Sequence, residues 1–297
     1  MSRELVSRVL VAGGTHGNEL TGAYLIKNWD QVMTFIPESF VVSKILGNPR
    51  AIQEKRRYCD QDLNRCFTVS DLDNSLLVHY EAVRAKEIYH QYGAHSEQPT
   101  DFVIDLHTTT TRMGATIVVL SKDGFMFDLI SYLVQCEPDI NVFFEPGDLA
   151  SAPYLYSIGK FGGILIEIGE VAQGLLRADI FLKTARLIEF VFKFFDAWNQ
   201  NKMFVALSTD IEAYQFIEKV NYPKTVDGSD LAAMIHPALQ GRDYQALHPG
   251  DPVFMAFNGE VIAYEGKEEL YPAFINEAAY YDSLTAFSLM RKIKLVR

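Results

Sequence analysis

Short apolar runs recur along the first two thirds of the chain, and each stops at turn residues such as glycine, asparagine, proline or threonine. Most are nearly continuous rather than alternating with polar residues. Runs of this kind predict strands that are covered on both faces, as in a mostly parallel or mixed sheet. The predicted strands span residues 8–14, 40–48, 102–108, 115–121, 141–147 and 162–170.

Three other segments space their apolar residues as an amphipathic helix does. Residues 18–29 and 76–93 show this pattern, and the second ends at Gly93, a favourable residue for closing a helix. Residues 178–200 form the longest helical pattern of the chain. Strands that alternate with helices predict an α/β architecture built in layers.

The pattern changes after about residue 205. From there on, short strand-like runs are interrupted by Pro, Gly, Asp and Asn, which is typical of a compact and mainly β unit. A chain of 297 residues is long enough for one large domain and a smaller one. We therefore predict an α/β domain of residues 1–204, with helices flanking a mixed sheet, and a β-rich C-terminal domain of residues 205–297.

Composition and charge narrow the classes of function. Hydrophobic residues make up 48% of the chain and charged residues 22%, as in an ordinary globular protein. The formal net charge of -11 argues against binding to nucleic acid, which needs a basic face. A small anionic substrate is still compatible with this charge, because a few arginines can dominate the field at one site.

Cysteine usage and hydropathy predict a cytoplasmic protein. Cys59, Cys66 and Cys136 are too few and too scattered for a disulfide framework, which favours a reducing compartment. Charged residues interrupt the N-terminal segment, so we expect no signal peptide. Because no apolar run reaches the roughly eighteen residues of a membrane span, we expect no membrane partner.

Polar side chains capable of chemistry follow three of the predicted strands. His16 and Glu19 come after the first strand, His107 ends the third, and Glu167 ends the last. Loops beyond the carboxyl ends of strands are where α/β proteins build their sites. Two histidines and a carboxylate form a standard catalytic zinc set, and a second carboxylate can act as general base.

The histidine–glutamate spacing is common by chance, and a histidine in a loop is more often solvated than bound to a metal. The other five histidines lie in polar contexts or precede proline, so only His16 and His107 directly follow apolar strands. Asp105 is open to two interpretations, namely a residue that orients a metal ligand and a simple strand-end cap.

Residues 56–67 concentrate Arg56, Arg57 and Arg65 next to Asn64 in a chain with few basic residues. Guanidinium groups bind carboxylates through two hydrogen bonds and stabilise developing oxyanions. This segment is therefore a candidate for substrate binding, and a solvated charged loop is the competing interpretation.

Several short motifs, taken together and in order, resemble the aspartoacylase family of zinc-dependent N-acyl-amino-acid deacylases, which is related in fold to the zinc carboxypeptidases. They extend over nearly the whole chain. The motifs are "GGTHGNELTG" (13–22), "NPRA" (48–51), "DLNR" (62–65), "DLHTTT" (105–110), "GLLRADI" (174–180), "LHPGDP" (247–252) and "NEAAYY" (276–281).

The resemblance implies a carboxypeptidase-like catalytic domain whose site is capped by the C-terminal β domain. It implies that His16, Glu19 and His107 hold one zinc ion per subunit, which would activate a water molecule. Glu167 would be the general base on that water and then the proton donor to the leaving amine. The products would be a short carboxylate, such as acetate, and a free amino acid.

The resemblance also implies roles in substrate recognition. Arg57 would polarise the scissile carbonyl, and Asn64 with Arg65 would hold the α-carboxylate of the substrate. Tyr280 and Glu277 would reach into the site from the second domain. Relatives form dimers and larger assemblies, so a homo-oligomer is expected as well.

Two positions depart from the family pattern for N-acetylaspartate. Tyr156 stands where an arginine is expected and Leu284 where a lysine is expected, so two positive groups for the second carboxylate are missing. A buried carboxylate without a cation costs several kcal/mol. Arg112 or Lys160 could supply the charge from another direction. Otherwise Tyr156 and Leu284 make the pocket more apolar.

The family pattern as a whole predicts an aspartoacylase, which converts N-acetylaspartate to acetate and aspartate. The departures raise the alternative of an aminoacylase for N-acyl aromatic or neutral amino acids. A carboxypeptidase is a further alternative, although a capping domain leaves little room for a peptide. A non-catalytic binding protein on the same fold would be expected to have lost a ligand or the base, and all four residues are present.

Overall fold

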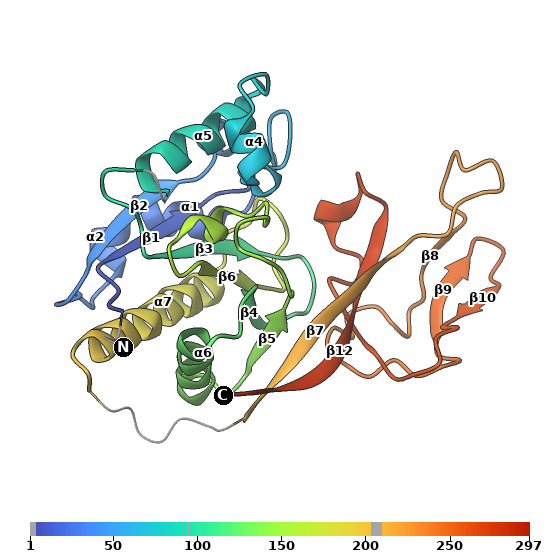
Figure 1. Cartoon of the computed structure of the whole chain (residues 1–297). Helices are drawn as coiled ribbons and strands as arrows, with labels where there is room; N and C mark the ends of the chain where they lie inside the picture. Colours follow the sequence, from blue (N-terminus) through green and yellow to red (C-terminus); the bar gives the residue numbers. More distant parts are fainter. Residues whose placement is uncertain (1–3, 94–95, 203–209) are drawn as a thin grey trace.

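The structure is a computed structural model and describes residues 4–93, 96–202 and 210–297. A mixed nine-stranded sheet runs through the molecule in the order β11-β12-β7-β5-β4-β6-β3-β1-β2 (Figure 1). Its strands are β1 (Arg8–Gly13), β2 (Val41–Leu46), β3 (Phe102–Thr108), β4 (Ala115–Val119), β5 (Ile140–Phe144), β6 (Gly163–Ile168), β7 (Asp210–Asn221), β11 (Tyr271–Ala273) and β12 (Thr285–Val296).

Helices cover both faces of this sheet, and a second sheet of three strands, in the order β10-β9-β8, lies in the C-terminal part (Figure 1). The small sheet is made of β8 (Ala233–Ile235), β9 (Pro252–Ala256) and β10 (Val261–Ala263). The helices are α1 (Leu20–Lys27), α2 (Trp29–Val32), α3 (Pro49–Glu54), α4 (Val69–Asp73), α5 (Tyr80–Tyr92), α6 (Gly124–Cys136) and α7 (Ala178–Asn199), with 3-10 turns η1 (Leu63–Arg65), η2 (Leu155–Ile158) and η3 (Ala278–Tyr280).

The predicted fold class is confirmed: the sheet is mixed, helices flank it, and the C-terminal part is mainly β. All six strands predicted in the first two thirds are present, and the three predicted helices correspond to α1 with α2, α5 and α7. None of the described helices is long and apolar enough to span a membrane.

The short helices α3 and α4, the longer helix α6 and strand β12 were not predicted from the sequence. Seven residues of helix α6 are buried, and its apolar residues lie on nearly every side of the helix. The sequence of this segment therefore lacks a clear hydrophobic period of 3.6 residues. Strand β12 carries charged residues along its C-terminal half, where it emerges into solvent beside β7.

The predicted boundary between residues 204 and 205 lies outside the described residues. On its C-terminal side, β7 pairs in parallel with β5 through Phe143–Tyr214 and Phe144–Gln215, and β12 pairs with β7 along most of its length. The C-terminal part therefore extends the main sheet as well as forming its own small sheet.

Alternation along the central strands separates a structural face of the sheet from a polar one. On β3, Phe102 and Ile104 point to the large core beneath α1, α6 and α7, while Val103 belongs to the opposite cluster. Because successive side chains on a strand point to opposite faces, Asp105 and His107 share the face of Val103. The same rule places Glu167 of β6 on that face with Leu165.

Close contact between β3 and β6 is essential for this arrangement. A Cβ atom added at Gly163 would lie 2.1 Å from the carbonyl oxygen of Val103. We predict that Gly163→Ala destabilises the protein by about 1–3 kcal/mol, as overpacking usually does, and lowers the melting temperature. Gly124→Ala is the matched control, because no heavy atom lies within 4 Å of its added Cβ. Equal melting temperatures for both variants would contradict this account.

Candidate active site

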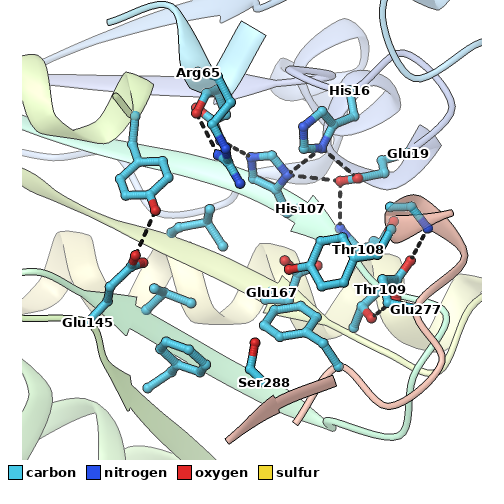
Figure 2. Close-up of a pocket in the computed structure, with 18 of the residues that line it drawn as sticks. His16, Glu19, Arg65, His107, Thr108, Thr109, Glu145, Glu167, Glu277 and Ser288 are labelled. Atoms are coloured by element: carbon cyan, nitrogen blue, oxygen red, sulfur yellow. Dashed lines mark hydrogen bonds and ion pairs between the residues drawn. The ribbon is translucent and has the colours of Figure 1, made fainter. Parts of the chain in front are cut away.

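Two histidines and a glutamate meet at one end of the central strands (Figure 2). His16 lies in the loop after β1, Glu19 directly precedes α1, and His107 belongs to β3. His16 Nδ1 lies 2.6 Å from Glu19 Oε1, and His107 Nδ1 lies 3.0 Å from Glu19 Oε2 and 3.1 Å from His16 Nδ1. All three side chains are buried, so the structure brings together the three predicted ligands.

Both imidazoles are held from behind by aspartates. His16 Nε2 lies 2.9 Å from Asp62 Oδ1, and His107 Nε2 lies 2.9 Å from Asp105 Oδ2. An Nε2–H that donates to a carboxylate leaves the lone pair on Nδ1, which turns that atom into a metal ligand. Asp105 therefore orients His107, and Asp62 does the same for His16.

The electrostatics of this cluster suit a cation. Burial opposes ionisation of Glu19, but His16 and His107 outweigh it and hold the pKa of Glu19 well below its ordinary value. Burial also disfavours a charged His107, yet Asp105 and Glu19 hold its pKa well above the usual value. The raised pKa of His107 shows that the group favours a positive charge at this place. Its ligand atoms, two imidazole nitrogens and a carboxylate oxygen, lie within 4.8 Å of one another, which fits a divalent metal ion.

Glu167 lies beside this cluster, because β6 pairs with β3 in a register that places it opposite His107. Its Oε1 atom is buried and has no hydrogen-bond partner among the described residues. Burial first, and then the nearby carboxylates of Glu19 and Glu277, hold the pKa of Glu167 well above its ordinary value. A buried carboxylate with an unused oxygen and a raised pKa is suited to accept and return a proton.

Arg57 reaches the cluster from the loop after α3. Its guanidinium donates to Glu19 Oε1 at 3.2 Å and to Asp62 Oδ2 at 3.1 Å. Its backbone carbonyl accepts a hydrogen bond from Gly17 N, which ties this loop to the loop of His16. The loop segment of Arg57 is therefore part of the site and not a solvated charged loop.

Arg65 and Asn64 follow on the 3-10 turn η1 and behave differently. The guanidinium of Arg65 lies over the ring of Tyr154, 5.2 Å from its centroid, at the wall of the pocket. The side chain of Asn64 is buried and occupied: its amide donates to Asp105 and its oxygen accepts from Leu155 N. The guanidinium of Arg65 donates one hydrogen bond, from Nη1 to the carbonyl of Asn64 at 2.6 Å, and its other N–H groups are suited to bind a substrate carboxylate.

The C-terminal part closes the site with Tyr280 and Glu277. Tyr280 lines the pocket from η3. Glu277 Oε2 accepts hydrogen bonds from Thr110 N and Thr110 Oγ1, at 2.9 and 3.0 Å, and from Thr109 Oγ1. Its other oxygen accepts from Ala279 N. Glu277 thus fastens the turn of Tyr280 to the loop that follows His107.

The pocket beside His16, Glu19 and His107 extends across the face of the sheet that carries Glu167. It contains about 810 Å³ of space, its open mouth included. Apolar and aromatic side chains dominate the end away from the histidines (Figure 2). Tyr156 lines this end, and its ring stacks on Tyr154 with centroids 5.3 Å apart. Further apolar residues that line the pocket are Val118, Phe143, Leu165, Phe216, Phe274 and Ala279.

Three residues considered for the side-chain pocket lie elsewhere. Leu284 lines a neighbouring groove and not this pocket. Arg112 pairs with Glu170, and Lys160 pairs with Glu4; neither lines the pocket. The expectation that Leu284 makes the pocket more apolar is therefore wrong, because its backbone turns it toward the groove.

Lys219 and Glu145 line the pocket and were missed. Glu145 directly follows β5 and accepts a hydrogen bond from the hydroxyl of Tyr154 at 2.8 Å. The strand-end criterion that identified His107 and Glu167 would have found it. Lys219 lies on β7, in the part of the chain expected only to cap the site, and its sequence context offered no signal.

Two family models match the chain. The Succinylglutamate desuccinylase/Aspartoacylase catalytic domain matches residues 6–195, and the AstE/AspA barrel-sandwich hybrid domain matches residues 209–292. A "Probable aspartoacylase" from Nostoc sp. is 42% identical over 288 residues, which cover 97% of each chain. A human "N-acyl-aromatic-L-amino acid amidohydrolase (carboxylate-forming)" is 41% identical over 96% of this chain and 90% of its own.

Among solved structures, murine aminoacylase 3 matches with a TM-score of 0.89 and 37% sequence identity over 100% of both chains. The match thus extends over the central sheet and the C-terminal β part. On these grounds the chain belongs to the succinylglutamate desuccinylase/aspartoacylase family.

Proposed function

We propose that this chain is a zinc-dependent hydrolase that cleaves the amide bond of N-acyl amino acids and prefers neutral, above all aromatic, side chains. One observation supports this preference. The end of the pocket away from His16 and His107 is lined by aromatic and aliphatic side chains, and Tyr156 stands where an arginine was expected. The human relative named for N-acyl-aromatic amino acids supports the same preference, and the likeness to aminoacylase 3 supports the acylase chemistry.

N-acetylaspartate is the second candidate, because Lys219 lines the pocket in addition to Arg57 and Arg65. Lys219 makes no salt bridge with any other residue in the described ranges, and its ammonium lies over the ring of Tyr280. Glu145 lines the same pocket and would repel a second substrate carboxylate. The name of the Nostoc relative favours this candidate.

His16, Glu19 and His107 would hold the zinc ion. When bound there, zinc acidifies a water molecule and polarises the acyl carbonyl. Glu167 then accepts the proton of the attacking water at its unused oxygen and delivers it to the nitrogen of the leaving amine. The guanidinium of Arg57 stabilises the negative charge that develops on the carbonyl oxygen.

Arg65 anchors the α-carboxylate of the substrate, since its guanidinium faces the pocket. Asn64 contributes next to it mainly by keeping η1 in place through its buried contacts. Tyr280 closes the pocket above the substrate, and Glu277 holds that residue in position. A pocket covered in this way suits a small acylated amino acid better than a peptide.

We predict that His107→Ala abolishes zinc binding, because the variant loses one of three ligands and the residue that Asp105 orients. Elemental analysis of the purified protein measures the metal content directly. His90→Ala is the control, since this histidine is exposed on α5 and should leave the zinc content unchanged. A full complement of zinc in His107→Ala would refute the ligand assignment.

We predict that Glu167→Gln keeps its zinc and lowers kcat by about 10²–10⁴-fold, the usual contribution of a general base. The exposed Glu170, three residues further on, provides the control: Glu170→Gln should retain wild-type turnover. If Glu167→Gln turns over substrate at the wild-type rate, another group takes the proton.

We predict a higher kcat/KM for N-acetylphenylalanine or N-acetyltyrosine than for N-acetylaspartate. Tyr156→Arg should shift the ratio toward N-acetylaspartate by about tenfold or more, because a hydrogen bond to a charged group contributes about 1.5–3 kcal/mol. Leu284→Lys is the matched control and should leave the ratio unchanged, since Leu284 lies outside the pocket. A preference of the wild type for N-acetylaspartate would instead identify Lys219 as the cation that recognises the second carboxylate.

A further inference from the structure

Glu81 is a fully buried carboxylate that accepts hydrogen bonds from four N–H groups. It lies in the first turn of α5. Its Oε1 atom accepts from Cys59 N at 2.6 Å and from Asn48 Nδ2 at 3.0 Å. Its Oε2 atom accepts from Asp60 N at 3.0 Å and from Gln61 N at 3.2 Å. Both oxygens are therefore saturated by donors.

Three of these donors are consecutive backbone amides in a segment without helix or strand. Residues 55–62 connect α3 to η1, so no ladder of backbone hydrogen bonds fixes their conformation. Buried backbone amides need partners, and Glu81 supplies partners for three of them at once. A single side chain thus pairs three consecutive amides of this segment.

The segment carries the polar groups that converge on the pocket. Arg57 lies two residues before the first of the three amides, and Asp62 directly follows the last. Asp62 contacts both His16 and Arg57, and Arg65 follows on η1. Any shift of the three amides would therefore move Arg57 and Arg65 relative to each other.

The fourth donor, Asn48, links Glu81 to the loop that carries His16. Asn48 caps α3 by accepting a hydrogen bond from Ala51 N, and its own backbone N–H donates to the carbonyl of Gly14. Gly14 lies two residues before His16. Glu81 consequently contacts residues 59–61 directly and is connected to the start of the His16 loop through Asn48.

We propose that Glu81 is a positioning residue of the hydrolytic reaction, which sets the geometry of Arg57 and Arg65 without touching substrate or metal ligand. The inference rests on the proposed function, since Arg57 and Arg65 act on the substrate there. Glu81 also lies near Asp60 and His79, a group that could hold a metal ion by distance alone. Glu81 is not suited to be a ligand there, because both of its carboxylate oxygens already accept hydrogen bonds from N–H donors.

The test compares Glu81→Gln with wild type in the zinc-loaded enzyme, using whichever N-acyl amino acid the wild type hydrolyses best. A glutamine turns an NH2 group toward one pair of donors, so the segment must shift. We expect kcat/KM to fall by about 10–100-fold, as misplacement of about 1 Å can do. The decrease should be shared between kcat, through Arg57, and KM, through Arg65, with an unchanged zinc content.

Asp196→Asn is the matched control. Asp196 of α7 is also a buried carboxylate that accepts backbone N–H groups, namely those of Glu38 and Ser39, but it lies on the opposite face of the sheet. We expect a similar loss of melting temperature in both variants and a wild-type kcat/KM in Asp196→Asn when assayed well below that temperature.

An unchanged kcat and KM in a folded Glu81→Gln variant, with the same loss of melting temperature as Asp196→Asn, would overturn the proposal. If Glu81→Gln does not fold, Asn48→Ala takes its place: it removes one donor of Glu81 and should lower kcat/KM several-fold, and an unchanged value would equally overturn the proposal. Failure of the wild type to hydrolyse any N-acyl amino acid would instead refute the proposed function, so the two failures are distinguishable.

Discussion

The site depends on an excess of carboxylates, buried or partly buried, around two imidazoles. Glu19 lies between His16 and His107, and Asp62 and Asp105 stand behind them. Burying that many carboxylates costs several kcal/mol for each one without a positive partner. Arg57 offsets part of this cost through its contacts with Glu19 and Asp62. A divalent cation bound by the two Nδ1 atoms and Glu19, which the geometry of this group fits, would offset more of it.

Much of this arrangement follows from simple rules applied to the sequence. Strand ends mark His16, His107 and Glu167, and alternation along β3 and β6 brings the last two to one face of the sheet. Asp62 could not be found in this way, because it lies in a segment without regular structure. Lys219 could not be found either, because the pairing of β7 with β5, which brings it to the pocket, joins segments far apart in the sequence.

Leu284 shows the limit of transferring a position from a family pattern. Tyr280, four residues earlier in the sequence, does line the pocket. The chain turns between the two residues, and Leu284 has a positive φ of 53°. Four residues are enough to direct a side chain into a different groove. Local backbone direction, which the sequence does not reveal, decides which side chains reach a substrate.

Two carboxylates attach the C-terminal part to the loop that follows His107. Glu277 accepts hydrogen bonds from the threonine loop after His107, and Asp243 accepts from Arg112 N and Ile275 N, which joins the same loop to the chain before Glu277. Burial raises the pKa of Asp243 to about 6. The turn of Tyr280 and the loop that follows His107 are thus joined by hydrogen bonds into one unit. A displacement of one would therefore be transmitted to the other and to the backbone next to His107.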